Sequence, residues 1–448
     1  MDVFVLLVLL ASGVLGVADQ TAPDPLRPVA ERYLKLVLAV GLHDADYVDA
    51  YYGPPGWRKQ VEAEKQRLGL PEIEQQATMV RADLAKVALP SGKGGDAELW
   101  RLRKESLERQ LAALLARVGM LRGRRLTFDE ESRALYDAVA PRHTESEFEG
   151  ILASLERKLP GAGPLVARYE RFKQDFVIPR DRLDAVFQAA IRAGRDRTRS
   201  YIELPAGESF TVEYVTGKSW SGYNWYQGKF RSLIQVNTDL PIYIDRALDL
   251  ACHEGYPGHH VYNVLLEKTL VRDRGWVEFT VYPLFSPQSL IAEGTANYGI
   301  EVAFPRSERI AFERDVLFPL AGITSDLAQQ YYDVLDLVDR LSYAGNEAAR
   351  RYLDGQIDAR AAADWLERYA MMPRPRAEQR VKFFDQYRSY VINYNLGKDL
   401  VKAYLENRTK DDRSPKRTWH EFAALLSSPR LPSGLNPSAH LGEEPSAR

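Results

Sequence analysis

Long segments with apolar residues at helical spacing cover most of this 448-residue chain, and they constrain its fold more than any other feature. Four such stretches lie between residues 24 and 204. The strongest, at 98–121, is rich in Leu, Ala, Arg and Glu, which favour helices. Another begins with Thr144 and Glu147, the spacing of a capping box. The pattern predicts a mainly α-helical fold.

A short region that starts near residue 206 departs from this helical pattern. The segments 209–215 and 230–238 alternate apolar with polar residues and are rich in β-branched and aromatic types, which is typical of strands. A turn-rich aromatic segment, 216–229, separates them. These residues predict a small antiparallel sheet of two or three strands inside one large helical domain. The sheet is expected beside the helix that carries the histidines described below.

Composition narrows the classes of partner. The 60 Lys and Arg residues nearly balance the 62 Asp and Glu residues, so nothing favours nucleic acid or an acidic membrane surface. The single cysteine, Cys252, excludes an internal disulfide, and stability must come from a large core. Cys252 itself is expected in that core. The sequence does not reveal the oligomeric state.

The first eighteen residues form a separate segment. The run VFVLLVLLASGVLGV is apolar but too short for a comfortable transmembrane helix. Gly16 and Ala18 place small residues on either side of Val17, so we expect a signal peptide cleaved after Ala18 and an exported, periplasmic or secreted protein. Because the segment carries Asp2 and no Lys or Arg, an uncleaved N-terminal anchor is the alternative. Membrane contact is expected through this segment alone.

Three of the seven histidines fall within eight residues, in the stretch ACHEGYPGHHVYN. His253 and Glu254 begin like the zincin motif HExxH, whose two histidines bind zinc from one helix face. The position of the second histidine is instead Pro257, whose ring collides with the carbonyl four residues earlier. The helix must kink or bulge there. The second ligand is then either His259 or His260, and helix geometry alone leaves both open.

The chemistry of zinc supports this interpretation and indicates the remaining residues. A catalytic zinc site keeps three protein ligands, which are His, Cys or carboxylates. Glu293 lies mid-helix among small and apolar residues, so it is the candidate third ligand, with a salt bridge to an arginine as the alternative. Glu254, beside a ligand histidine, is placed to act as general base on water. These ligands suit Zn²⁺, and they also suit Mn²⁺ or Co²⁺.

The motifs HEGYPGHH and EGTANYGIE, together with IPRDRL, KSWSGYNWYQG and YNLGK, resemble the bacterial domain-of-unknown-function 885 family over most of the chain. That family looks like the largely helical gluzincin metallopeptidases, such as the angiotensin-converting-enzyme and oligopeptidase groups. The resemblance implies His253, His259 and Glu293 as metal ligands and Glu254 as the base. It leaves His260 as a neighbour within the catalytic set.

The resemblance also implies a tyrosine that stabilises the oxyanion, a contribution worth several kcal/mol in related peptidases. Tyr390 and Tyr394 are both available, and Tyr394 matches the YxxG of the family. A tyrosine half-buried in a helix is the alternative role. The chain departs from the family at Thr295 and Asn297, where Trp and Leu are usual, and this changes the lining of the site.

The aromatic segment between the strands supplies candidate substrate-binding residues. These are Trp220, Tyr223, Trp225 and Tyr226. An edge strand beside a metal can bind an extended peptide by strand addition. Packing within the core or a loop is the alternative for these rings.

These assignments predict an exported zinc-dependent hydrolase, a metallopeptidase that cleaves short peptides. A zinc hydrolase of a non-peptide amide or ester is a second hypothesis, and a binding or structural protein whose metal only staples the kinked helix is a third. The expected layout is a signal peptide (1–18), N-terminal helices (19–205), the sheet (206–240), metal-site helices (241–310), C-terminal helices (311–430) and a loose tail (431–448).

Overall fold

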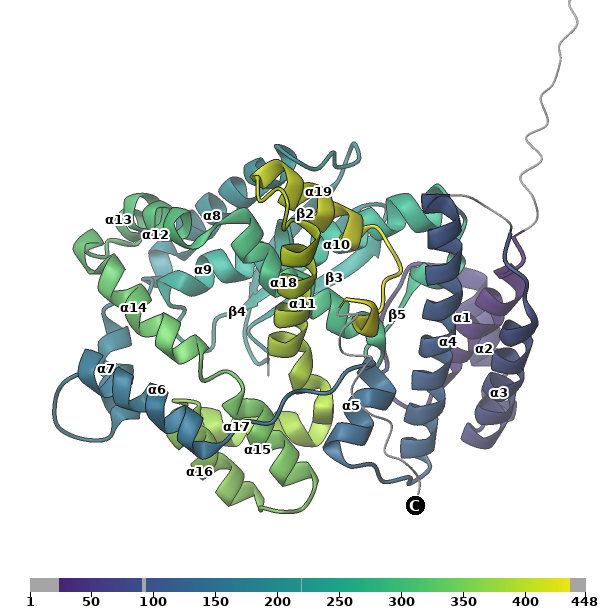
Figure 1. Cartoon of the computed structure of the whole chain (residues 1–448), viewed down its shortest axis with the longest axis horizontal. Coiled ribbons are helices and arrows are strands. Elements are labelled where there is room, and N and C mark those ends of the chain that lie inside the picture. Colours follow the sequence, from purple (N-terminus) through teal and green to yellow (C-terminus); the bar gives the residue numbers. More distant parts are fainter. Residues whose placement is uncertain (1–23, 91–93, 219, 436–448) are drawn as a thin grey trace, which may run out of the picture.

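The computed structural model describes residues 24–90, 94–218 and 220–435, and this part of the chain is mainly helical, as the sequence predicted (Figure 1). The predicted signal segment lies outside the described residues. Among the residues described, no helix combines the length and apolarity needed to cross a bilayer.

The N-terminal helices lie close to the predicted segments. Thr144 caps its helix as predicted: its Oγ1 accepts the N–H of Glu147, and the Glu147 carboxylate accepts the N–H of Thr144. The α-helices are α1 (Arg27–Val40), α2 (Pro55–Ala63), α3 (Leu70–Lys86), α4 (Gly95–Leu121), α5 (Phe128–Tyr136), α6 (Glu145–Lys158), α7 (Leu165–Gln174) and α8 (Leu183–Arg199). Two short 3₁₀ turns are η1 (Lys65–Arg67) and η2 (Arg180–Arg182).

The small sheet lies where the alternating residues predicted it, but it is mixed and not purely antiparallel. Its strands are β2 (Ser209–Val215), β3 (Gly222–Gly228) and β4 (Arg231–Asn237), in the order β2-β4-β3. A two-residue turn at Lys229 and Phe230, both with positive φ, folds β3 back antiparallel on β4. Since two successive reversals return the chain to its first direction, β2 pairs parallel with β4. Strand β3 is therefore an edge strand.

A second, two-stranded sheet was not predicted. It pairs β1 (Val48–Tyr51) antiparallel with β5 (Val281–Pro283), which lie more than 200 residues apart in the chain. Such short strands leave little periodicity to detect in a sequence. The pairing brings an N-terminal loop to the centre of the molecule.

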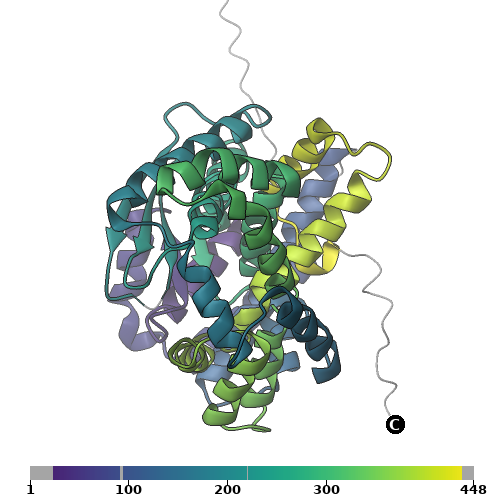
Figure 2. The same ribbon diagram turned by 90° about the vertical axis from the view of Figure 1, so that its left-hand side faces the viewer.

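The remaining helices follow the sheet in the chain. They are α9 (Ile244–Leu250), η3 (Ala251–Gly255), α10 (His259–Leu266), η4 (Glu267–Arg272), η5 (Val277–Thr280), α11 (Pro287–Ala303), α12 (Arg306–Phe312), η6 (Glu313–Leu317), α13 (Phe318–Ala321), η7 (Ser325–Leu327), α14 (Ala328–Asp339), α15 (Ala344–Leu353), α16 (Ala359–Tyr369), α17 (Arg374–Tyr387), η8 (Arg388–Val391), α18 (Ile392–Arg408), α19 (Pro415–Leu426) and η9 (Pro432–Gly434). Figure 2 shows the last of these, in yellow, at one edge of the molecule.

The first residues of the predicted loose tail are packed. Leu431 and Leu435 are buried, and the N–H of Ser433 donates to Asp137 (3.1 Å). Apolar side chains thus override the polar, Pro- and Gly-rich composition that predicted a tail from residue 431. Residues 436–448 lie outside the described part of the chain.

Two hydrophobic clusters share helices α11 and α18, which run side by side at the centre of Figure 1. On α11, Leu290 belongs to one cluster and Ile291 to the other. On α18, Leu396 belongs to the first and Val401 to the second. These two helices therefore join the halves of the fold.

Two glycines bring the backbones of α11 and α18 into contact. A Cβ at Gly294 would overlap the carbonyl of Gly397, and a Cβ at Gly397 would lie 2.8 Å from the carbonyl oxygen of Leu290 and 3.0 Å from Cα of Gly294. Every other residue type carries a Cβ, so the spacing of the helices requires glycine at both positions.

We expect Gly294→Ala or Gly397→Ala to lower the free energy of unfolding by about 1–3 kcal/mol or more, because the new methyl group forces the helices apart. Gly150, at an open position within α6, is the matched control. Gly150→Ala should raise stability by up to about 1 kcal/mol, since alanine favours the helix. Thermal and urea unfolding measure both effects. Equal effects at the three sites would contradict the close approach.

Candidate metal centre

The helix that carries His253 is interrupted, as Pro257 predicted. It starts as α9, widens into the π-helical segment η3, and resumes as α10 at His259. The N–H of Tyr256 donates to the carbonyl of Ala251 (3.2 Å), five residues back, as in a π-helix. Such one-turn π segments are frequent at functional sites.

Gly258 lets the chain turn back tightly after η3. Its N–H donates to the carbonyl of Cys252 (2.9 Å), and a Cβ there would overlap the backbone carbonyl of His253. The sequence PGH thus ends the first helical segment, turns the chain back on itself and starts α10. The first residue of α10 is His259, so the interruption places this histidine beside His253. Cys252 is buried, as predicted.

The structure brings together His253, His259 and Glu293. Nε2 of His253 lies 3.1 Å from Nε2 of His259, and Glu293 of α11 approaches both rings, with Oε2 3.4 Å from His253 Nε2 and Oε1 3.8 Å from His259 Nε2. The ligand atoms all lie within 4.8 Å of one another. Two nitrogens bound to one tetrahedral zinc ion are roughly 3.3 Å apart, so the spacing fits a shared ion.

Asn297, one turn after Glu293, fixes the tautomer of His253. The Asn297 amide donates to the carbonyl of Tyr394 (3.0 Å), so its Oδ1 faces Nδ1 of His253 (3.0 Å). Nδ1 must then be the donor, which leaves a lone pair on Nε2, as a metal ligand requires. Sequence reasoning treated Asn297 only as a departure in the site lining and did not find this contact.

Glu293 is held by a different partner. The buried hydroxyl of Tyr390 donates to its Oε1 (2.9 Å). Its other oxygen, Oε2, is buried and makes no hydrogen bond to any residue described. A buried carboxylate oxygen without a partner is costly. This oxygen and the two facing Nε2 atoms fit a cation held by the three side chains, and no arginine within residues 24–90, 94–218 or 220–435 pairs with Glu293.

Burial and neighbouring charges shift the pKa values of these groups. Burial lowers the pKa of His259 to about 4, which keeps this ring neutral, the form that binds metals. Burial raises the pKa of Glu293, but the close approach of the His253 and His259 rings and the hydrogen bond from Tyr390 outweigh burial and lower that pKa below its usual value. Glu293 is thus an anion at neutral pH.

Glu254 faces the same space from η3. Its carboxylate has no hydrogen bond or ion pair with any residue described. Strand β3 lies directly against it: a Cβ at Gly222 would be 2.9 Å from Oε1, and the amide of Asn224 donates to the Glu254 carbonyl (2.7 Å). Burial raises the pKa of Glu254 to about 7, and the charge of Glu293 adds to this shift. Glu254 is therefore a candidate to accept and release a proton near neutral pH.

His260 does not join the cluster, contrary to its expected place in the catalytic set. Its Nδ1 is bound to the hydroxyl of Ser232 (2.8 Å) and its Nε2 to Glu208 (3.0 Å), both in the core. Consecutive side chains on a helix point about 100° apart, so α10 cannot aim His259 and His260 at one point. Burial alone raises the pKa of Glu208, but hydrogen bonds from His260 and Tyr256 lower it to about 2.

The two candidate tyrosines differ in their contacts. The hydroxyl of Tyr390 holds Glu293, whereas the hydroxyl of Tyr394 makes no hydrogen bond to a described residue. Their rings lie 5.8 Å apart. The charges of Glu293 and Glu254 both raise the pKa of Tyr394, in addition to the larger effect of burial, so this ring lies near both acids. The Tyr394 hydroxyl is thus not engaged by a described residue, and its role toward a substrate stays a prediction.

The four aromatic candidates on and before β3 separate into two groups. Tyr223 packs against Trp220 (5.5 Å between centroids) and against Trp225 (4.5 Å), and Trp225 is 42% exposed. Tyr226 is buried, and its hydroxyl donates to Glu267 (2.5 Å). Side chains alternate between the faces of a strand, so Tyr226 packs inward and cannot meet a substrate.

Asp49 is a site residue that sequence reasoning missed. It lies on β1 and accepts a hydrogen bond from the hydroxyl of Tyr223. Burial raises the pKa of Asp49 to about 6, and the charge of Glu293 adds to the shift. Only the β1–β5 pairing, between segments far apart in the chain, places it here.

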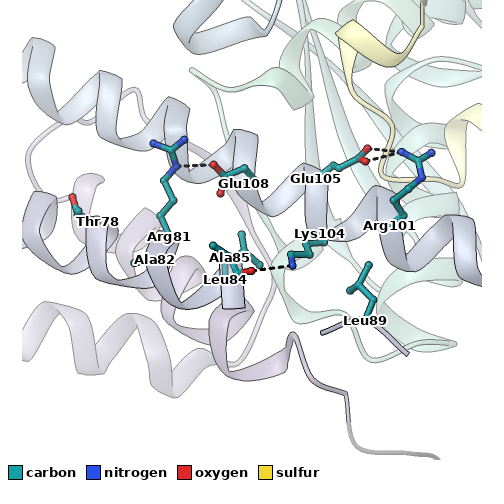
Figure 3. Close-up of a pocket in the computed structure, with 10 residues that line it drawn as sticks. All are labelled: Thr78, Arg81, Ala82, Leu84, Ala85, Leu89, Arg101, Lys104, Glu105 and Glu108. Atoms are coloured by element: carbon teal, nitrogen blue, oxygen red, sulfur yellow. Dashed lines mark hydrogen bonds and ion pairs between the residues drawn. The ribbon is translucent and has the colours of Figure 1, made fainter. Parts of the chain in front are cut away.

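One cavity lies away from this cluster. It has a volume of about 630 Å³ and lies between α3 and α4 (Figure 3). Its charged side chains already have partners: Arg81 pairs with Glu108 (2.7 Å), and Lys104 donates to the Val87 carbonyl (2.6 Å). This cavity gives no chemical reason to expect a reaction.

Comparisons with known proteins show a likeness of fold. No protein-family model matches the chain, and no curated protein matches it by sequence. The fold is similar to that of a Colwellia psychrerythraea protein provisionally described as a lipoprotein, with a TM-score of 0.50 and 15% identity over 84% of this chain and 71% of the other. Membership of the domain-of-unknown-function 885 family stays a prediction.

Two further solved structures are similar at lower scores. One is a carboxypeptidase of Pyrococcus furiosus (TM-score 0.47, 12% identity, 94% of this chain and 96% of the other). The other, from Shewanella oneidensis, is provisionally described as a lipoprotein of unknown function (TM-score 0.45, 14% identity, 95% and 80%). At these identities the likeness concerns the fold alone.

We expect His259→Ala to lose stoichiometric metal and His260→Ala to keep it. The second change should instead lower the free energy of unfolding by about 1–3 kcal/mol, because Glu208 and Ser232 lose a buried partner. Elemental analysis after dialysis measures the metal, and urea unfolding measures stability. Metal retained by His259→Ala would refute the ligand assignment.

We expect Tyr390→Phe to weaken metal binding by about 10- to 100-fold, because the hydroxyl that orients Glu293 is removed. Competition with a chelator of known affinity measures this change. Tyr387→Phe is the matched control, since the hydroxyl that holds Glu293 is that of Tyr390, and the Tyr387 variant undergoes the same chemical change. An equal loss in both variants would contradict a specific role for Tyr390.

Proposed function

We propose that this protein is an exported metallohydrolase that cleaves short peptides. The observation that carries the proposal is the convergence of His253, His259 and Glu293, with the unpaired carboxylate of Glu254 in the same space. A purely structural zinc site usually fills four positions with protein ligands. Three ligands and a free acid beside them are instead typical of a catalytic site.

The three ligands would hold the ion, and Zn²⁺ is the ion that this donor set suits best. When bound, such an ion polarises a carbonyl oxygen and lowers the pKa of a water molecule. Glu254 would accept a proton from water and pass it to the leaving amine. The Tyr394 hydroxyl would donate to the developing oxyanion of the substrate.

The position of strand β3 favours a peptide as the substrate over other amides. It is the edge strand of its sheet, and Gly222 at its start lies against Glu254. An extended peptide that adds to such an edge forms backbone hydrogen bonds regardless of its sequence. Tyr223 and Trp225, on one face of β3, are the candidate side-chain contacts; an amide or ester without a peptide backbone would not use this edge.

We expect Glu254→Gln to keep its metal and to lose peptide hydrolysis by about 10²- to 10⁴-fold, the usual contribution of a general base. Turnover is measured on a mixed peptide library, and metal content by elemental analysis. Glu301→Gln is the matched control on α11, because Glu301 pairs with Lys398 (2.8 Å) and lies outside the cluster.

Three outcomes separate the alternatives. Glu254→Gln that retains full turnover would refute the assigned base. Wild-type protein without stoichiometric metal would refute the metal-dependent mechanism. Hydrolysis of esters or non-peptide amides without hydrolysis of any peptide would favour the second hypothesis.

A further inference from the structure

Arg388 has a backbone conformation that residues with a Cβ rarely adopt. It follows α17 with φ 52° and ψ −124°, whereas Asp137, which also has positive φ, has a ψ of 28° and lies in the left-handed helical region. The angles of Arg388 are those of the first central residue of a type II′ turn, a position that favours glycine. Such strain persists only where the surrounding structure holds it, and it is frequent at functional sites.

The carboxylate of Glu131, on α5, holds this turn. Its Oε2 accepts a hydrogen bond from Nε of Arg388 (2.7 Å), and its Oε1 accepts both the N–H (3.1 Å) and the hydroxyl (2.7 Å) of Ser389. Glu131 is 1% exposed, and Ser389 is fully buried. One buried acid thus makes three hydrogen bonds to two consecutive residues, and hydrogen bonds to a charged group are the strong ones.

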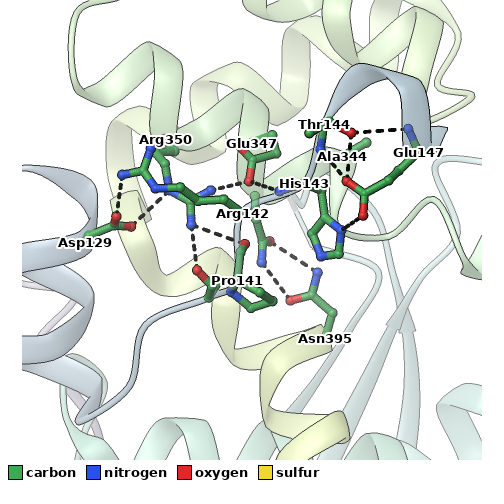
Figure 4. Close-up of polar contacts among 12 residues, drawn as sticks. Asp129, Pro141, Arg142, His143, Thr144, Glu147, Ala344, Glu347, Arg350 and Asn395 are labelled. Carbon is green, nitrogen blue, oxygen red and sulfur yellow. Dashed lines mark hydrogen bonds and ion pairs between the residues drawn. The ribbon is translucent and has the colours of Figure 1, made fainter. Parts of the chain in front are cut away.

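Helix α5 is itself anchored to α15. Its Asp129 pairs with the buried Arg350 of α15 (2.9 Å; Figure 4). At the start of α5, the N–H of Phe128 donates to the carboxylate of Asp354, which caps the end of α15 (2.7 Å). The carboxylate of Glu131 therefore extends from a helix that is fixed in place.

Tyr390, the residue after Ser389, connects this turn to the candidate metal centre. Its hydroxyl donates to Oε1 of Glu293 (2.9 Å). Its ring also packs edge-on against Tyr136 of α5, with centroids 5.9 Å apart. Helix α5 thus fixes Tyr390 twice, through the backbone before it and through its ring. Since a hydrogen bond tolerates only a narrow range of distance and angle, a turn that relaxed at Arg388 would move the hydroxyl away from Glu293.

We propose that Glu131 is a positioning residue for the candidate metal centre: by holding the strained turn, it keeps the Tyr390 hydroxyl on Glu293. This inference rests on the proposed function and extends the site to a residue on α5 whose own hydrogen bonds go to Arg388 and Ser389. If Glu131 only neutralised Arg388, its loss would lower stability and leave metal affinity unchanged.

The first experiment measures zinc affinity by competition with a chelator. Glu131→Gln should weaken zinc binding by about 10-fold, the lower end of the range for an outer partner of a metal ligand, because the turn loses its charged acceptor. Glu421→Gln is the matched control, since Glu421 is similarly buried and pairs with Arg408 and Arg417 (2.7 Å each). It should lower the midpoint of urea unfolding and leave zinc affinity unchanged; an equal loss of affinity in both variants would overturn the proposal.

Ser389→Ala is the milder variant, and it decides the question if Glu131→Gln does not fold. It removes one donor to Glu131 and leaves the ion pair with Arg388 in place. It should give a smaller loss of zinc affinity in the same direction. Unchanged affinity in a folded Ser389→Ala would contradict the role of the turn.

A double-mutant cycle with Tyr390→Phe tests whether Glu131 acts through Tyr390. If it does, Glu131→Gln should cost little further zinc affinity once the Tyr390 hydroxyl is absent. Losses that multiply would show that the two residues act independently and would overturn the proposal.

Substitution of Arg388 tests the part that strain plays. Glycine adopts the observed angles without a Cβ clash, so Arg388→Gly should restore most of the zinc affinity that Glu131→Gln loses. Arg388→Ala removes the same charge but keeps the Cβ, and it should restore none. Equal behaviour of the two variants would refute a turn held under strain.

Failure of the proposed function is a separate outcome. Zinc binding without peptide hydrolysis would refute that function, and the affinities above would still decide the role of Glu131. If wild-type protein binds no zinc, the cycle between Glu131→Gln and Tyr390→Phe is measured by urea unfolding of the metal-free protein. Coupled effects then support the proposed support of Tyr390, and additive effects overturn it.

Discussion

The backbone contact between Gly294 and Gly397 determines where the chemical groups of this protein meet. It brings α11 close enough to α18, and to η8 just before it, for Glu293 to accept a hydrogen bond from the hydroxyl of Tyr390. One turn later, Asn297 bridges the Tyr394 carbonyl and the ring of His253. A methyl group at either glycine would move these partners by more than a hydrogen bond tolerates. The helix contact and the ligand geometry are therefore one constraint.

The site also concentrates negative charge. Asp49, Glu254 and Glu293 come from β1, η3 and α11, and none of them pairs with Lys or Arg in the part of the chain that the structure describes. Their mutual repulsion raises the pKa of Asp49 and Glu254 beyond the effect of burial. Such an arrangement is unfavourable for folding alone. The donor atoms of His253, His259 and Glu293 would allow a bound cation to offset it.

Local patterns predicted the helices, the capping box at Thr144, strands β2 and β4, and an interrupted helix at Pro257. They also indicated His253 and Glu293 as candidate ligands, because a histidine followed by a glutamate and a mid-helix glutamate are unusual in those settings, and the structure places both residues with His259. The choice between His259 and His260 depended on the π-helical path of η3, which spacing does not encode. Asp49 and Asn297 stayed hidden because their roles depend on contacts across distant segments, β1 with β3 and α11 with α18.

The adjacent histidines His259 and His260 lie in different environments, the first beside His253 and the second in the core. The turn at Gly258 starts α10 with His259 directed at His253, and the next side chain points about 100° away, into the core. There His260 binds Glu208, which also accepts the Tyr256 hydroxyl (2.7 Å). Since Tyr256 lies within the interruption itself, Glu208 connects both ends of the break to the start of β2. The sheet thereby supports the segment that the helix can no longer hold through its own hydrogen bonds, and it keeps the edge of β3 at a fixed distance from Glu254.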